Sequence, residues 1–150
     1  LDVGSSGNTF ASEHGSRFEV TAVDYAPAKP SVLECDFLNL AVAPPGSCPE
    51  FESSGSLRQW PAEDFDVAVF GLLLSVLPGP AARASAVAKA RRLLRAAPGR
   101  GLLIIADTVK SVGRHSDRVA RGSAWVKAVE AAGFRLLSDP QLHLSRTWER

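Results

Sequence analysis

A glycine turn and an acidic residue follow the first two predicted strands, where they can bind an amino acid and a ribose. Residues 1–8 predict a strand, a glycine turn and the start of a short helix. Gly4 lets the backbone approach a ligand, and Asp2 can accept a hydrogen bond from an amino group. Asp24 ends the strand predicted over residues 18–23, twenty residues after Gly4, a position from which a carboxylate binds both hydroxyls of a ribose. The alternatives are a merely connecting glycine turn and a turn-forming Asp.

A further acidic residue, Asp36, follows the strand predicted over residues 31–35 and is itself followed by Phe37. The carboxylate can meet the exocyclic amine of an adenine while the aromatic ring packs on the base. A helix-capping Asp beside a core Phe explains the same pair without any ligand. The sequence leaves both interpretations open at this position.

The stretch from Phe70 to Pro78 follows the most apolar predicted strand, where a transferred group would meet its acceptor. Leu72–Leu74 are expected in the core, which leaves Phe70, Gly71 and Ser75 as candidate ligand contacts. The stretch contains no general base and neither Asn-Pro-Pro nor Asp-Pro-Pro. No catalytic residue is therefore assigned from the sequence.

The other reactive side chains indicate neither a metal site nor hydrolytic chemistry. The histidines at positions 14, 115 and 143 are scattered and lack the spacing of metal ligands. Cys35 and Cys48 form no CxxC pair, and we expect free thiols, with a disulfide as the alternative. The sequence also shows no Ser-His-Asp pattern, phosphate-binding loop or paired carboxylates. Nucleophilic hydrolases and nucleoside triphosphatases are therefore poor fits.

Alternating strand-like and helix-like segments position these residues. Compact apolar runs predict two central strands covered on both faces, with shorter strands before and after them. An Ala- and Arg-rich segment that starts with Pro predicts one helix, and an amphipathic segment that ends at a Gly predicts another. The expected strands cover residues 18–23, 31–35, 65–70, 101–106, 134–137 and 142–148, and the helices cover residues 80–97 and 117–132. This alternation predicts an α/β sandwich that binds ligands at the carboxyl ends of its strands.

Residues 41–61 stand out by their Pro, Gly and Ser content, which predicts a long, flexible loop outside the ligand site. Trp60 is expected to pack at the start of the following strand, away from the ligand edge. The 150 residues predict one domain, and no apolar run is long enough for a membrane span. Because the chain lacks Met and opens on the end of a strand, we expect a further part upstream.

Charge is unevenly distributed, although the net charge is only +1. Residues 1–82 carry eleven acidic and three basic side chains, whereas residues 83–135 carry twelve basic and three acidic ones. A basic half of this kind can bind phosphates. Solvated helix faces explain it equally well, since Arg and Lys are also good helix formers.

These segments, in this order, resemble one family, and the resemblance covers nearly the whole chain outside residues 41–61. It is the family of the yeast nucleolar 25S ribosomal-RNA adenine-N(1) methyltransferase and its animal relative SAMTOR, an S-adenosylmethionine sensor. The specific parts are Cys35-Asp-Phe-Leu-Asn39 and Leu72-Leu-Leu-Ser75, while the glycine turn is generic. The other matching segments are Asp2-Val-Gly-Ser5 with Asn8 and Phe10, Val23-Asp24 with Pro27-Ala28, Ser31-Val32, Phe65–Phe70, Pro78, Gly101–Ile105, Ser123–Trp125 and Gly133-Phe134.

The resemblance implies a Rossmann-like class I S-adenosylmethionine-dependent methyltransferase fold, with a mostly parallel sheet and helices on both faces. It implies cofactor contacts at Gly4, Asp24, Asp36, Phe37 and Gly71, to which the residue patterns above add Asp2 and Phe70. Gly71 stands where the family usually has Ser, which removes a side-chain hydrogen bond to the cofactor. Ser6 replaces the usual second glycine of the turn. The helical part that the family also uses for the cofactor would lie upstream of this chain.

The resemblance further implies methyl transfer to adenine-N(1) of large-subunit ribosomal RNA, in the nucleus and nucleolus. N(1) is already nucleophilic, so that positioning matters more than a strong base. The ribosomal RNA would lie on the basic half, and base extrusion would bring the adenine to the methyl group. The alternative is a cytoplasmic sensor that binds the cofactor and a protein partner without methyl transfer. Neither interpretation involves a membrane or a metal.

Overall fold

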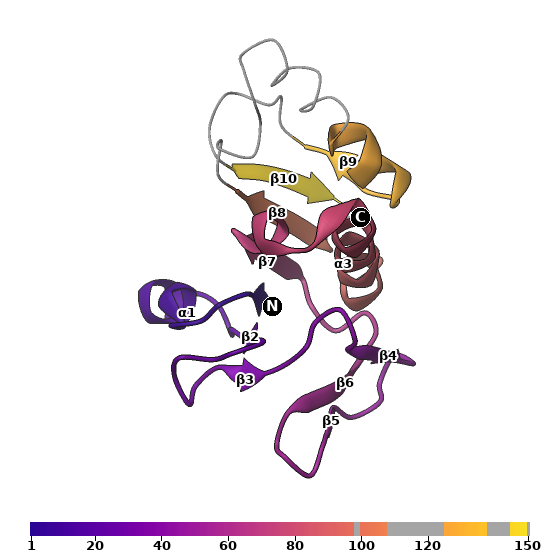
Figure 1. The fold of residues 1–150 in the computed structure, drawn as a ribbon. Coiled ribbons are helices and arrows are strands. Elements are labelled where there is room, and N and C mark those ends of the chain that lie inside the picture. Colours follow the sequence, from indigo (N-terminus) through magenta and orange to yellow (C-terminus); the bar gives the residue numbers. More distant parts are fainter. Residues whose placement is uncertain (98–99, 108–124, 138–144, 150) are drawn as a thin grey trace.

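The described residues form one large, seven-stranded sheet and one small sheet (Figure 1). The computed structural model describes residues 1–97, 100–107, 125–137 and 145–149. The strands of the large sheet are β1 (Asp2–Val3), β2 (Ala22–Asp24), β3 (Leu33–Glu34), β7 (Val67–Gly71), β8 (Leu102–Ala106), β9 (Arg135–Leu136) and β10 (Ser145–Glu149). Their order across the sheet is β3-β2-β1-β7-β8-β10-β9.

The large sheet is wound outward from β1 in both directions. Val3 pairs with Val23 of β2 on one side and with Phe70 of β7 on the other, and the five strands from β3 to β8 across the sheet are parallel. β10 runs antiparallel to both of its neighbours, β8 and β9. After β1, the chain places β2 and β3 on one side of it and then crosses back to place β7 on its other side. The order of the strands reverses at this point, and such a topological switch point leaves room for a ligand. The predicted Rossmann-like α/β fold is confirmed.

The helices with described bounds are α1 (Thr9–His14), α2 (Leu73–Val76) and α3 (Gly79–Leu93), and residues 125–131 are also helical. α3 carries Pro80 in its first turn, where the missing N–H is not needed. The helix was predicted to extend to residue 97, but Leu94 leaves it and bridges Phe65. Of the helix predicted over residues 117–132, residues 117–124 lie outside the described part of the chain.

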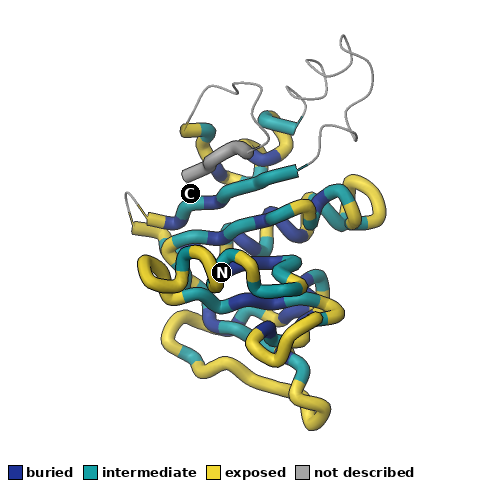
Figure 2. The backbone as a smooth tube through the Cα atoms, turned by 90° about the vertical axis from the view of Figure 1, so that its left-hand side faces the viewer, coloured by how far each residue is buried: buried dark blue, intermediate teal, exposed yellow. Residues whose placement is uncertain are grey.

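The core lies between the central strands and α3. Phe70 of β7 and Leu103 of β8 are completely buried, and α3 adds Leu93 at the same cluster. The small side chains of Ala86 and Ala90 let this helix approach closely. Burial of one such Leu side chain contributes about 2 kcal/mol. Figure 2 shows buried residues along the middle of the molecule and exposed residues mainly in the peripheral loops.

The outer strands differ in their bounds from the prediction. β2 begins at Ala22 instead of residue 18, because the Phe18 amide donates to the His14 carbonyl at the end of α1. The Phe18 ring also packs on Phe10 of that helix, with 5.9 Å between the ring centroids. β9 and β10 lie where two closing strands were expected, and residues 142–144 are outside the described part.

Residues 41–61 contain a three-stranded sheet, so the prediction of a loop without regular structure is wrong. β4 (Ala41–Ala43) pairs in parallel with β6 (Leu57–Pro61), and β5 (Glu50–Phe51) pairs with β6 in the antiparallel direction. The Pro, Gly and Ser residues that suggested a loop lie mainly in the turns between these short strands. β5 and β6 form a local hairpin, whereas β4 pairs with residues eighteen positions further along the chain, which no local pattern indicates.

Candidate functional site

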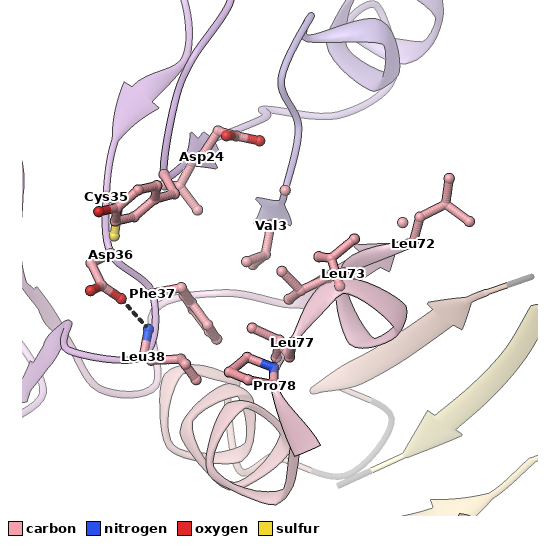
Figure 3. Close-up of a pocket in the computed structure, with 15 residues that line it drawn as sticks. Val3, Asp24, Cys35, Asp36, Phe37, Leu38, Leu72, Leu73, Leu77 and Pro78 are labelled. Carbon is pink, nitrogen blue, oxygen red and sulfur yellow. Dashed lines mark hydrogen bonds between the residues drawn. The ribbon is translucent and has the colours of Figure 1, made fainter. Parts of the chain in front are cut away.

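A cavity of about 670 Å³ opens at the carboxyl ends of β1, β2, β3 and β7. Residues that follow β2 and β3 form one side, and residues that follow β7 form the other (Figure 3). This volume is typical of small-molecule sites. Five of the predicted site residues line the cavity, namely Gly4, Asp24, Asp36, Phe37 and Gly71.

Gly4 turns the chain at the end of β1 with a φ of +81°, a conformation that glycine adopts without steric strain. The amides of Gly4 and Ser5 both donate to the carbonyl of Val23, at 2.9 and 3.2 Å, which ties the turn to β2. A Cβ on Gly4 would meet Leu73 at 3.6 Å, an ordinary contact. The backbone conformation, rather than crowding, therefore requires glycine here.

Asp24 fastens the glycine turn with both of its carboxylate oxygens. One oxygen accepts a hydrogen bond from the Ser6 amide and the other from the Ala26 amide, each at 2.8 Å. Each carboxylate oxygen has two lone pairs, so that one acceptor position on each oxygen is left for the hydroxyls of a ribose. The turn-forming role and the ligand role are therefore compatible.

Asp36 caps the turn that follows β3. One oxygen accepts from the amides of Leu38 and Asn39, at 3.1 and 3.3 Å, and the other accepts from the Asn39 side chain at 2.8 Å. Figure 3 shows the bond to Leu38. Phe37 is buried and packs edge-on against Phe70, with ring centroids 5.8 Å apart. The capping Asp and the core Phe are thus both present, and the same two residues line the cavity.

The side of the cavity that follows β7 is apolar. Leu74 is fully buried and Leu73 partly so, but Leu72 is 52 % exposed, which makes the expected core position wrong for Leu72. Leu72 has a φ of +62°, which is uncommon for a bulky residue. Its amide donates to the Ala106 carbonyl and its carbonyl accepts from the Ser75 hydroxyl, both at 2.7 Å. These two bonds hold the chain where it leaves the sheet.

Three residues expected at the site lie outside the cavity lining. Phe70 is completely buried in the core, because successive strand residues face opposite sides of a sheet. Ser75 uses its hydroxyl on the Leu72 carbonyl. Asp2 is only 7 % exposed, and this burial raises the pKa of its carboxyl, with a smaller effect in the same direction from Asp24.

Three residues to which the sequence assigned no role lie in the cavity lining or support it. Tyr25 is 76 % exposed at the cavity, and its place directly after Asp24 is the signal that could have revealed it. Cys35 lines the cavity but is buried, and this burial raises its pKa to about 12. Lys89 of α3 donates to two carbonyls of the Asp36 turn, a contact between distant segments that no local pattern indicates.

The small sheet takes no part in the cavity lining. Trp60 of β6 stacks on Phe65, with ring centroids 5.3 Å apart, and donates to Asp64 at 2.9 Å. These contacts lie just before β7 begins, whereas the cavity lies at the other end of this strand. The predicted position of Trp60 at the strand start is therefore confirmed.

Several basic side chains after residue 82 bond to other segments of the protein. Among the residues that the structure describes, five basic side chains donate to backbone carbonyls or to Asp66, at 2.6 to 3.2 Å. They are Lys89, Arg91, Arg92, Arg95 and Arg100. These bonds hold neighbouring segments together, and the four arginines among them stay at least partly exposed, which is compatible with the solvated interpretation.

Within the described ranges, no three His, Cys, Asp or Glu side chains gather to hold a metal ion. No helix in these ranges is long and apolar enough to cross a bilayer. Cys35 and Cys48 are free thiols, as expected.

Comparison with known proteins gives relatives over most of the chain. No protein-family model matches it. A protein of Danio rerio named S-adenosylmethionine sensor upstream of mTORC1 is 38 % identical over 143 residues, which are 90 % of this chain and 34 % of that protein. Proteins of the same name from Xenopus tropicalis and Xenopus laevis are each 36 % identical over 146 residues, 92 % of this chain and 34 % of each relative.

The chain spans about a third of the length of these relatives. The aligned part includes nine tenths of the residues of this chain, and the described fold within it has the mostly parallel sheet and the strand-end cavity that were predicted. Over the part that it spans, the chain is therefore similar to the S-adenosylmethionine sensors upstream of mTORC1, and it has a Rossmann-like methyltransferase fold.

Proposed function

We propose that this chain is the S-adenosylmethionine-binding part of a cytoplasmic sensor that acts through a protein partner. One observation carries the proposal: the glycine turn, Asp24 and the Asp36–Phe37 pair, which come from three strands, converge on one cavity. The names of the relatives support the same ligand and the same role upstream of mTORC1.

The residues at the cavity fit S-adenosylmethionine in their chemistry. The ribose hydroxyls would donate to the remaining lone pairs of Asp24, and the adenine amine would donate to Asp36. The backbone of Gly4 would leave space for the methionine part. The positive sulfonium group suits a cavity whose charged lining residues, within the part of the chain that the structure describes, are the two carboxylates Asp24 and Asp36.

The apolar side of the cavity favours binding without methyl transfer. A nucleobase acceptor has to be oriented next to the methyl group, and hydrogen-bonding side chains commonly do this. Among the described residues after Gly71, those that line the cavity are Leu72, Leu73, Val76, Leu77 and Pro78. Their side chains offer neither donors nor acceptors, which supports the sensor over the enzyme.

Methyl transfer to adenine-N(1) of ribosomal RNA is the second candidate, and the basic composition of residues 83–135 favours it. Among the described basic residues of this segment, Arg95 and Arg100 pair with Asp66, which offsets part of the charge that they can offer to phosphates. Because the apolar side of the cavity also favours the sensor, we propose the enzyme second, with a nucleolar location in that case.

Calorimetry on the full-length protein with S-adenosylhomocysteine and its 2′-deoxyribose analogue tests the ribose assignment. Asp24→Ala should weaken binding of the ribose form by about 1–3 kcal/mol, because charge-assisted hydrogen bonds are lost. The preference of the wild type for the ribose form should disappear in this variant. Glu19→Ala, at an exposed residue outside the cavity lining, is the matched control. An unchanged preference in Asp24→Ala would contradict the assignment.

A second experiment separates the two functions. Full-length protein is incubated with methyl-labelled S-adenosylmethionine and total RNA, and label in the RNA is measured. The sensor proposal predicts binding of the ligand and no labelled adenine. N(1)-methyladenosine formed at a rate that depends on the protein would establish the enzyme instead.

A further inference from the structure

Lys89 connects α3 to the cavity wall although it does not line the cavity. Its ammonium group donates to the carbonyls of Leu38 and Leu40, at 2.7 and 2.6 Å, across about fifty residues of sequence. The side chain is half-buried, and this desolvation lowers the pKa of Lys89. A lysine normally extends into water, so its position between two backbone carbonyls is a specific structural feature.

The contact completes the hydrogen bonds of the turn at residues 36–40. The amides of Asn39 and Leu40 donate to the Asp36 carbonyl, at 3.0 and 2.8 Å, and the Leu38 amide donates to the Asp36 side chain. Asp36 thereby satisfies the donors of the turn, and Lys89 satisfies two of its acceptors. Without Lys89, two partly buried carbonyls would lose their donor, which favours another turn conformation.

This turn carries the proposed adenine-binding wall. Phe37 and Leu38 both line the cavity, and Phe37 lies within 5.9 Å of the Lys89 ammonium group, measured to the ring centroid. A cation at this distance attracts the face of an aromatic ring. Lys89 therefore restrains both the backbone of the turn and the ring at its centre.

We propose that Lys89 is a positioning residue that sets the nucleobase specificity of the site. It acts through Phe37, Leu38 and the Asp36 carboxylate, whose distance from the base decides whether an exocyclic amine is preferred over an oxygen. The proposal rests on the proposed function, because it assumes that the cavity binds an adenosyl ligand.

The test measures the dissociation constants of S-adenosylhomocysteine and S-inosylhomocysteine, which differ at the group that faces Asp36. Lys89→Met keeps the apolar stem and removes the donors, and it should reduce the preference for adenine by at least about fivefold. Lys89→Arg keeps charge and donors and should retain most of the preference. Lys127→Met, at an exposed lysine of the helical residues 125–131, should behave as the wild type.

The ratio of the two constants separates positioning from general destabilisation. A loss of folded protein weakens both ligands by the same factor and leaves their ratio unchanged. A wild-type ratio in Lys89→Met overturns the proposal. If Lys89→Met does not fold, Lys89→Leu, which also removes the donors, replaces it, and a wild-type ratio there overturns the proposal equally. A wild type that binds neither ligand would refute the proposed function itself, and the inference with it.

Discussion

Replacement of Gly71 by Ser should tighten the binding of S-adenosylmethionine. Gly71 ends β7 and lines the cavity, and a Cβ built on it meets no atom within 4 Å. Its φ is not among the positive values found at other glycines, so that a serine fits the strand conformation. The new hydroxyl would lie at the cavity wall and would restore the hydrogen bond that the resemblance assigns to a Ser at this position.

The size of the effect follows from one neutral hydrogen bond. Its net contribution is about 0.5–1.5 kcal/mol, which corresponds to a dissociation constant about two to ten times lower. The added Cβ also removes freedom from the unfolded chain, which stabilises the protein by about 0.4–1 kcal/mol independently of the ligand. Gly71→Ala carries this second effect without the hydroxyl and is therefore the matched control.

Titration calorimetry of the wild type, Gly71→Ser and Gly71→Ala provides the comparison, and thermal unfolding without ligand reports the stability of each. We expect the Ser variant to bind more tightly than the Ala variant, while the two have similar unfolding temperatures. If the Ser variant binds no more tightly than the Ala variant, the cofactor does not approach the end of β7 and lies in the cavity in another orientation.

Three further predictions follow from glycine strain, carboxyl burial and thiol burial. Gly4→Ala should lower the free energy of unfolding, measured in urea, by about 1–2 kcal/mol, because φ is +81° at this position. Gly7, whose φ is not positive, provides the control, and an equal loss in Gly7→Ala would contradict the prediction. Burial raises the pKa of Asp2 above its ordinary 3.8, so the native state holds this proton more tightly than the unfolded state. The resulting stability is present below the unfolded pKa and is lost as the pH rises through the native pKa, so Asp2→Asn should raise the unfolding temperature at about pH 7 and not at about pH 3; an equal gain at both would refute it. Iodoacetamide should label the exposed Cys48 and spare the buried Cys35, whose pKa is raised to about 12, and equal labelling in a peptide map would show that Cys35 is accessible.

The predictable part of the site lies where strands end. The carboxyl ends of parallel strands meet at one edge of the sheet, so Asp24 at the end of β2 and Asp36 after β3 come together once the strand order is known. Gly4 was equally visible, because a glycine directly after a strand marks a turn that other residues adopt only with strain. Local sequence was sufficient for these three positions.

The amino-acid sequence by itself determined the fold class and the strand-end motifs, since both depend on hydrophobic periodicity and on residues close together in the chain. Only the tertiary structure decided the rest. It paired β4, β5 and β6 where turn residues suggested a loop, and it turned Phe70 into the core. It also brought Lys89 to the carbonyls of a turn about fifty residues away. Such contacts form only when packed elements meet, because a hydrogen bond between distant segments depends on the position of both and on neither sequence alone.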